Sequence, residues 1–379
     1  MMTSAVRDIF RTNLGVRKNE RVLLFNDRIA EGESLSDVER ERRNNLRSLA
    51  LLAADVGKSL CASLLYHEYR ATGSHGAEPP AAIWELAFGP RAVRALKQKR
   101  LFARLLAKRA DAREIAQAGD IIARYRGDAV DCVIALANYS TSHTRFRDFL
   151  TRICRCRYAS MPLFDVSMLE GAMNVDWKAL AERTRRLAKE MNAAESVSLR
   201  TGNGSFLAFS VRGRRAFSDT GILTMPGAFG NLPAGEVFLA PVEGTARGKL
   251  VLEWGPTSQL SSPVTLTVED GHVTDVSGTD EYAQRLRDKL SEREENRNIA
   301  ELGIGTNTGA KRPDNILESE KMFGTVHIAL GDNSSFGGKV STPFHQDFVF
   351  FRPTLTLFRR DGSRRDILKA GSFVDMEER

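Results

Sequence analysis

The chain has 379 residues, of which 42% are hydrophobic and 27% charged, the composition of an ordinary globular protein long enough for two domains. A chain of this length needs no disulfide or structural metal to form its core, and the four cysteines, which include no Cys-x-x-Cys pair, are expected to be reduced. No apolar stretch has the length of a membrane helix or the form of a signal peptide, so we predict a cytoplasmic protein with no membrane partner.

The first 165 residues alternate between strand and helix patterns. Buried-strand patterns occur at 20–25, 59–65 and 129–137, and helical patterns at 6–14, 46–56, 83–88 and 91–117. This alternation is typical of a mostly parallel sheet flanked by helices, so we predict an α/β N-terminal domain over 1–165. No glycine-rich phosphate loop follows the first strand, which argues against a dinucleotide cofactor.

The formal net charge is +7, and the excess of basic residues is concentrated in 91–126. A basic stripe along a helix is one feature of nucleic-acid-binding proteins. Here no aromatic-interleaved basic stretch and no known binding motif accompanies it. We therefore interpret the stretch as a solvated helix face and predict no nucleic-acid partner.

From residue 166 the pattern changes to short strands separated by turn residues. Strand patterns occur at 196–200, 205–211, 236–241 and 249–254, a hairpin over 264–276 turns at Asp270-Gly271, and helices are predicted at 177–191 and 280–293. These elements predict a β-rich α+β C-terminal domain over 166–379.

Two histidines of this second region have neighbours that suit a metal site. Alternation over 325–330 places three large apolar residues on one face and His327 on the other. At His345-Gln346-Asp347 the same period of two sets an imidazole beside a carboxylate. Such a pair suits a divalent ion, because both groups can converge on it without distortion of the backbone. The alternative is a histidine that a carboxylate orients within a structural network.

Several carboxylates also occupy unusual positions. Glu301 lies within the apolar stretch 298–305, where its burial is costly unless it is paired or bound to a cation. Glu236 begins another apolar strand, and there the alternative is a side chain that faces water. Glu318 and Glu320 precede the His327 strand and are either surface residues or neighbours of the metal.

Four ordered segments resemble the aminopeptidase T family of binuclear metallo-aminopeptidases, in particular its leucyl aminopeptidase-like branch. They are Gly227–Phe238, Asn298–Asn307, Glu320–Asn333 and His345–Asp347, and the resemblance covers most of residues 195–365. It implies a homodimer whose C-terminal domain holds two divalent ions, zinc or cobalt, with manganese or magnesium as alternatives. The resemblance places the metal ligands at Glu236, Glu301, His327, His345 and Asp347.

Two positions depart from the family pattern. Better-known members have a tyrosine seven positions after the motif histidine, and this position is Ser334 here. They also have a ligand glutamate five positions before that histidine, and this position is Met322 here. Because serine reaches less far than tyrosine, we expect slow peptide cleavage. Glu320 is our candidate general base, since a carboxylate near the metals can take the water proton and return it to the leaving amine. His143 follows a predicted strand and is a candidate for the wall of the substrate cleft.

These features predict a metal-dependent aminopeptidase, a hydrolase that removes N-terminal residues from a peptide substrate with a water activated by two metals. The alternative enzyme is a mononuclear non-haem iron, ring-cleaving dioxygenase of the same superfamily. His327, His345 and Asp347 supply the two-histidine, one-carboxylate set that such an enzyme needs. An iron ion held by these three residues needs open coordination positions. The carboxylates of Glu236 and Glu301 would occupy such positions, which argues against this alternative. A third alternative is a metal-binding protein without catalysis.

Overall fold

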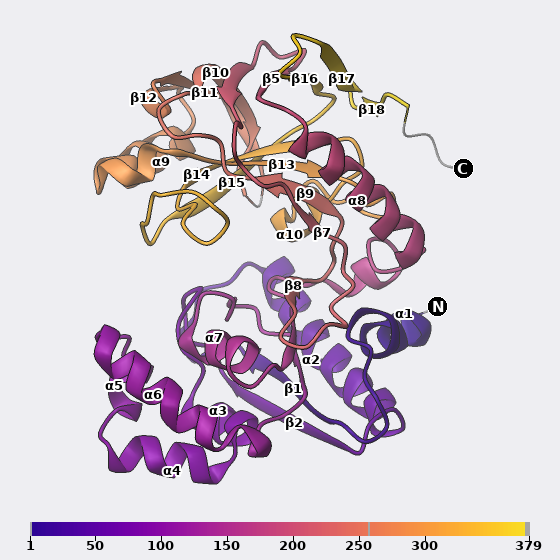
Figure 1. The fold of residues 1–379 in the computed structure, drawn as a ribbon, viewed down its shortest axis with the longest axis vertical. Coiled ribbons are helices and arrows are strands. Elements are labelled where there is room, and N and C mark those ends of the chain that lie inside the picture. The colour runs from indigo at the N-terminus through magenta and orange to yellow at the C-terminus, as the bar shows by residue number, and fades with distance from the viewer. Residues whose placement is uncertain (1, 257, 376–379) are drawn as a thin grey trace. The chain divides into compact units, whose positions relative to one another are not determined.

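The computed structural model describes residues 2–256 and 258–375, and two units of the chain are distinguished in it (Figure 1). The first unit takes in the chain up to Asn174 and a later segment, Gly221–Pro233. The second takes in Val175–Thr220 and the chain from Ala234 onward. The chain therefore passes from one unit to the other three times, whereas the sequence suggested a single change near residue 165.

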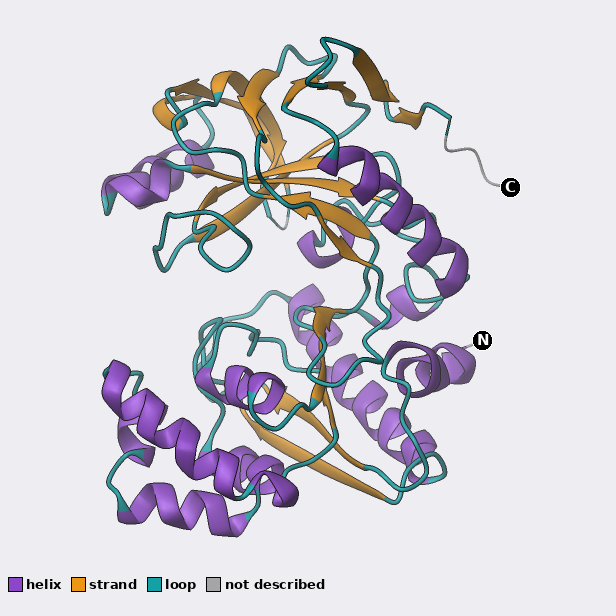
Figure 2. Cartoon of the chain, viewed as in Figure 1, coloured by secondary structure: helices purple, strands orange, loops and turns teal. Residues whose placement is uncertain are grey.

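A five-stranded parallel sheet forms the centre of the first unit, with the strand order β2-β1-β3-β4-β8. Its strands are β1 (Arg21–Arg28), β2 (Ser63–Arg70), β3 (Cys132–Ala135), β4 (Arg157–Ser160) and β8 (Phe229–Asn231). Nearly all residues of β1, β3 and β4 are buried, as expected for a parallel sheet with helices on both sides (Figure 2). The α/β architecture predicted for this region is confirmed.

The helices of the first unit differ from the prediction in one stretch. They are α1 (Met2–Asp8), η1 (Ile9–Asn13), α2 (Asp37–Lys58), α3 (Ala81–Phe88), α4 (Pro90–Gln98), α5 (Phe102–Leu106), α6 (Ala112–Arg124), η2 (Arg126–Asp128), α7 (Arg145–Arg152) and η3 (Val166–Leu169). The single helix predicted over 91–117 is wrong. Arg100 and Lys108 have positive φ angles, which end α4 and α5, and Asp111 and Glu114 cap each other's backbone to begin α6.

Two antiparallel sheets form the second unit. The larger has the order β12-β11-β10-β6-β5-β16-β17-β18, and the smaller has the order β15-β14-β13-β9-β7. The bounds are β5 (Ser196–Arg200), β6 (Phe206–Ser210), β7 (Phe217–Asp219), β9 (Glu236–Leu239), β10 (Arg247–Trp254), β11 (Gln259–Glu269), β12 (His272–Ser277), β13 (Ile299–Gly305), β14 (Val326–Gly331), β15 (His345–Phe350), β16 (Thr354–Phe358), β17 (Arg364–Lys369) and β18 (Ser372–Phe373). The helices are α8 (Trp177–Asn192), α9 (Glu281–Ser291), η4 (Glu294–Arg297) and α10 (Ile316–Ser319). The predicted β-rich α+β class is confirmed.

One apolar core is shared by the two sheets of the second unit. On the smaller sheet, alternate residues of β13, β14 and β15 contribute to it, among them Ile304, Ile328 and Phe348. Because side chains alternate along a strand, the residues between these apolar ones project from the opposite face of the sheet. That face carries the predicted metal ligands.

Among the helices in the described residues, none is both long enough and apolar enough to cross a membrane.

Candidate metal centre

The candidate ligands lie on four neighbouring strands of the smaller sheet. The register places Glu301 and Asp347 on either side of Ala329, so that their side chains share one face of the sheet. His327 lies opposite Gly303, and Glu236 lies opposite Gly305. Residues more than a hundred positions apart in the sequence thus lie on one face of the sheet. For His327, this is the face that strand alternation predicted.

The two imidazoles lie on either side of Glu301. Its Oε1 is 3.5 Å from Nε2 of His327, and its Oε2 is 3.3 Å from Nε2 of His345. His327 also lies 3.4 Å from Oε2 of Glu236, and His345 lies 3.5 Å from Oδ1 of Asp347. Each imidazole therefore faces two carboxylates, which is the arrangement of a cation site and not of a single oriented histidine.

The donor atoms fit a divalent ion. Three overlapping sets each have their ligand atoms within 4.8 Å of one another. They are Glu236, Glu301 and His327; Glu301, His345 and Asp347; and Glu320, His327 and Asp347. Within the described residues, the buried Oε2 of Glu236 has no hydrogen-bond donor. A buried carboxylate oxygen without a donor is stabilised by a cation beside it, either a protonated His327 at 3.4 Å or a metal ion, and imidazole with carboxylate suits the transition metals.

Glycines make room for these side chains. A Cβ at Gly303 would lie 2.0 Å from the His327 ring, so the imidazole rests directly on the backbone of β13. A Cβ at Gly305 would lie 2.0 Å from the carbonyl oxygen of Met322. The segment after α10 therefore packs against β13 at backbone distance, and this close contact carries Glu320 and Lys321 to the site.

Lys321 is a member of the cluster that the sequence analysis did not single out. Its side chain is 1% exposed, and its Nζ lies 2.5 Å from Oε1 of Glu236 and 2.6 Å from Oε1 of Glu320. A buried ammonium needs such partners because its desolvation is costly. The sequence offers only one signal for it, the position beside Glu320 in a segment that precedes a metal-binding strand.

A loop after β14 orients the second histidine. The carbonyl oxygen of Asp332 accepts a hydrogen bond of 2.8 Å from Nδ1 of His345, which directs Nε2 toward the carboxylates. Asn333 is fully buried and holds the loop through Val340 and Glu243. The hydrogen bond at Nδ1 therefore fixes the orientation of the His345 ring from the side that faces away from the candidate metal.

The remaining predicted positions lie outside the three ligand sets. Ser334 is exposed, and its hydroxyl donates to Asp332 at 2.9 Å. Glu318 is buried and accepts the backbone N–H of Lys311 at 2.8 Å, which supports the loop before α10. His143 is an exposed residue of the first unit.

The charges of the cluster shift the pKa values of its members. Burial alone would lower the pKa of His327, but the hydrogen bond to Glu301 and the charges of Glu236 and Asp347 raise it to about 9. Burial likewise acts against the charged form of His345, yet Asp347 and Glu301 raise its pKa well above the usual range. Burial raises the pKa of Glu320 to about 8, against the lowering effect of Lys321.

We expect metal binding to release protons. In the metal-free protein at pH 7 the raised pKa values keep His327 and His345 protonated, whereas a metal binds the neutral imidazole. Affinity should therefore fall as the pH falls below about 9, by about tenfold per pH unit for each proton released. Calorimetric titration with Zn²⁺ at pH 7, in two buffers of different ionisation heat, measures the number of protons. Tight binding with no proton release would contradict this prediction.

Aromatic side chains line the sheet beside the ligands. Phe336 lies edge-on to the His345 ring at 6.1 Å and to Phe238 at 5.7 Å, and Phe238 stacks on Phe217 at 5.5 Å. All three phenylalanines are partly exposed. Phe238 lies two positions after Glu236 on β9 and therefore projects from the same face as the ligands. The centre thus has an apolar, aromatic border.

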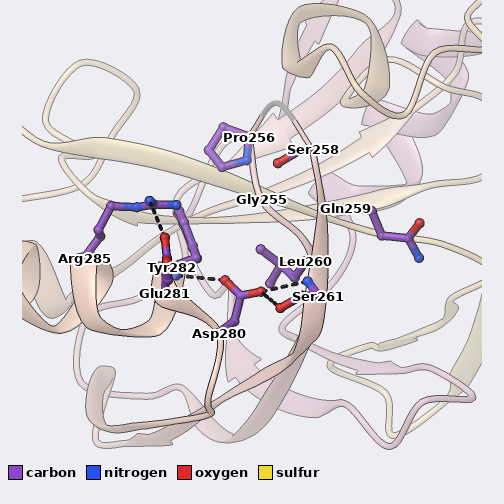
Figure 3. Close-up of a pocket in the computed structure, with 10 residues that line it drawn as sticks. All are labelled: Gly255, Pro256, Ser258, Gln259, Leu260, Ser261, Asp280, Glu281, Tyr282 and Arg285. Carbon is purple, nitrogen blue, oxygen red and sulfur yellow. Dashed lines mark hydrogen bonds and ion pairs between the residues drawn. The ribbon is translucent and has the colours of Figure 1, made fainter.

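A surface pocket elsewhere in the second unit has a different character (Figure 3). It lies between the end of β10, the start of β11 and the start of α9. Its carboxylate Asp280 is already hydrogen-bonded, because it accepts from the Ser261 hydroxyl at 2.6 Å and from the Tyr282 backbone at 2.8 Å. We interpret these contacts as the cap of α9 and find no cluster of metal ligands among the residues that line this pocket.

The fold and the ligand cluster together form a domain in which one face of an antiparallel sheet carries a candidate metal centre. The chain belongs to the 2,5-dihydroxypyridine 5,6-dioxygenase family, whose family model matches residues 128–375. This match covers all of the described second unit, including every candidate ligand.

Individual relatives agree with the family. A 2,5-dihydroxypyridine 5,6-dioxygenase of Pseudomonas putida KT2440 is 29% identical over 184 residues, which are 44% of this chain and 52% of the relative. The match thus spans about half of that protein. The structure of 2,5-dihydroxypyridine dioxygenase from the same organism has a TM-score of 0.69 at 18% identity, covering 99% of this chain and 97% of that chain. Wild-type AmpT from Thermus thermophilus has a TM-score of 0.61 at 15% identity, covering 98% of both chains.

The family match corrects the predicted activity. The prediction of a metallo-aminopeptidase, and with it the assignment as a hydrolase and protease, is wrong, because the family is one of dioxygenases. The resemblance to aminopeptidase T holds at the level of the fold, as the AmpT structure shows. One fold can carry different chemistries, so likeness of fold does not decide between them.

Proposed function

We propose that the protein is a mononuclear non-haem iron dioxygenase that opens the ring of a hydroxylated pyridine, with 2,5-dihydroxypyridine as the first candidate substrate. The observation that carries this proposal is the family match over the whole ligand-bearing unit. The family uses iron, and the two-histidine, one-carboxylate set of His327, His345 and Asp347 is the donor set of non-haem iron oxygenases. When bound, ferrous iron supplies the ability to activate dioxygen and to hold an oxygen-bearing substrate.

The side chains of the centre have separate roles in this proposal. His327, His345 and Asp347 hold the ion, and the Asp332 carbonyl keeps the His345 ring oriented. Glu320 is mostly buried beside His327 and Asp347, so it is placed to hold or accept a proton from a substrate hydroxyl. Glu320 thus keeps an acid–base role in this proposal, but its substrate is a hydroxylated ring and not the peptide predicted from the sequence.

The aromatic border supports a ring-shaped substrate. Phe336 and Phe238 offer ring edges and faces next to the ligands, and aromatic rings pair favourably in stacked or edge-to-face geometry. A flat heterocycle can use these contacts. We therefore expect pyridines with ring hydroxyls to bind more tightly than aliphatic acids of similar size.

The direct test is oxygen consumption. Protein purified without a tag and loaded with ferrous iron under anaerobic conditions is mixed with 2,5-dihydroxypyridine, and dissolved oxygen and ring absorbance are followed together. We expect one dioxygen consumed per ring lost, and no release of nitroaniline from leucyl p-nitroanilide with zinc or cobalt. Bound iron without oxygen uptake on any dihydroxypyridine, or rapid cleavage of the anilide, would contradict the proposal.

A further inference from the structure

Two neighbouring ligand sets of the centre have the layout of a two-metal site. Glu236, Glu301 and His327 form one set, and Glu301 belongs also to the set with His345 and Asp347. A carboxylate shared between two such sets is the usual bridge of a binuclear centre. The ligands alone would therefore permit two ions.

Lys321 changes this arrangement. Its ammonium lies 2.5 Å from one oxygen of Glu236, while the other oxygen of the same carboxylate faces His327 at 3.4 Å. The second partner of the ammonium is Glu320 at 2.6 Å. Lys321 thus forms ion pairs with the two carboxylates that His345 does not contact, and it does so from a position with 1% exposure.

We propose that the Lys321 ammonium takes the place of a second metal ion, so that the centre binds a single divalent ion per chain. A dication bound by Glu236 would lie within a few ångströms of a fixed positive charge, in a buried region where water screens little.

The backbone holds this ammonium in place. Gly305 allows the carbonyl of Met322 to pack on β13, and the N–H of Asn307 donates to the Lys321 carbonyl at 2.9 Å. The chain on either side of the lysine is therefore fixed against the sheet. Lys321 is a positioning residue, because it acts on the centre through Glu236 and Glu320.

The test counts metal ions. Metal-free protein is dialysed against excess Co²⁺, freed of unbound ion and analysed for cobalt per chain by mass spectrometry. We expect one cobalt in the wild type and in Lys321→Arg, which keeps the charge, and two in Lys321→Met, which leaves the two carboxylates without a cation. Lys339→Met, at an exposed lysine of the same unit, is the matched control and should bind one.

Further variants separate the outcomes. In Lys321→Met with Glu236→Gln the count should return to one, because the second ion then lacks its ligand. Two cobalt ions in the wild type, or one in a folded Lys321→Met, would overturn the inference, and the wild-type count decides if that variant does not fold. The inference does not rest on ring cleavage, so a chain that binds one ion but consumes no oxygen would contradict only the proposed function.

Discussion

Replacing His345 or Asp347 by alanine is expected to remove the iron that we propose for the centre, and with it the proposed turnover of a ring substrate. Changes in groups that only orient a metal ligand cost about 10–100-fold, so loss of a direct ligand should weaken iron binding by more than about 100-fold. The fold should persist, because both residues lie at a partly exposed end of β15 and outside the apolar core. We expect the metal-free variants to unfold within about 4 °C of the metal-free wild type, equivalent to roughly 1–2 kcal/mol.

The matched control is His272→Ala. His272 lies on β12 in the same unit and, like His345, has its Nδ1 bonded to a backbone carbonyl, that of Asp270 at 2.9 Å. It is outside the ligand sets, so iron content and oxygen uptake should be unchanged. Iron per chain, turnover and thermal unfolding are measured side by side. Full iron content in either His345→Ala or Asp347→Ala would remove that residue from the centre.

Replacing Gly303 by alanine should have an effect nearly as large without touching any ligand. The new Cβ would lie 2.0 Å from Nε2 and Cε1 of His327, and this ring is buried with 1% exposure. The ring cannot remain in place, so its nitrogen must move away from Glu301 and from the metal. We expect iron affinity to fall by about 100-fold, the upper end of the cost of a displaced ligand.

Gly202→Ala is the control for this variant. Gly202 lies in the second unit, and a Cβ there meets no heavy atom within 4 Å. Neither Gly202 nor Gly303 has a positive φ angle, so backbone strain does not separate the two. Iron binding is compared by titration under anaerobic conditions. Equal affinity in Gly303→Ala and wild type would mean that His327 does not bind the ion from its position in this structure.

Local sequence patterns predicted the parts of the site that depend on a single strand. The alternation over 325–330 put His327 on the face opposite the core, and the structure has it there. The glycines of β13 allow a close backbone approach at Gly303 and Gly305, which local alternation does not describe. The convergence of the five candidate ligands from four strands was expected only from the family resemblance, because pairing between distant strands leaves no local pattern.

Other features could not be predicted in this way. The burial of Lys321 results from packing of a loop on β13, and lysine in a short turn is usually exposed. The ligand residues also could not predict whether the reaction is a hydrolysis or an oxygenation, since both use imidazole and carboxylate ligands on the same fold. Glu236 counted as evidence against a single-metal centre because its ion pair with the buried Lys321 was not recognised from the sequence. The homodimer stays a proposal from the resemblance.

The position of the short strand β8 in the sequence affects how the first unit folds during synthesis. It pairs with β4 and is the last strand of the parallel sheet, yet it is separated from the rest of the first unit by 175–220. During synthesis on the ribosome, that sheet stays incomplete until residue 233 has emerged, by which time β5, β6 and β7 are already outside. A fragment that stops at Asn174 would leave β4 as an open edge, a known cause of aggregation. The first unit should therefore be produced on its own only with Gly221–Pro233 rejoined to it through a linker.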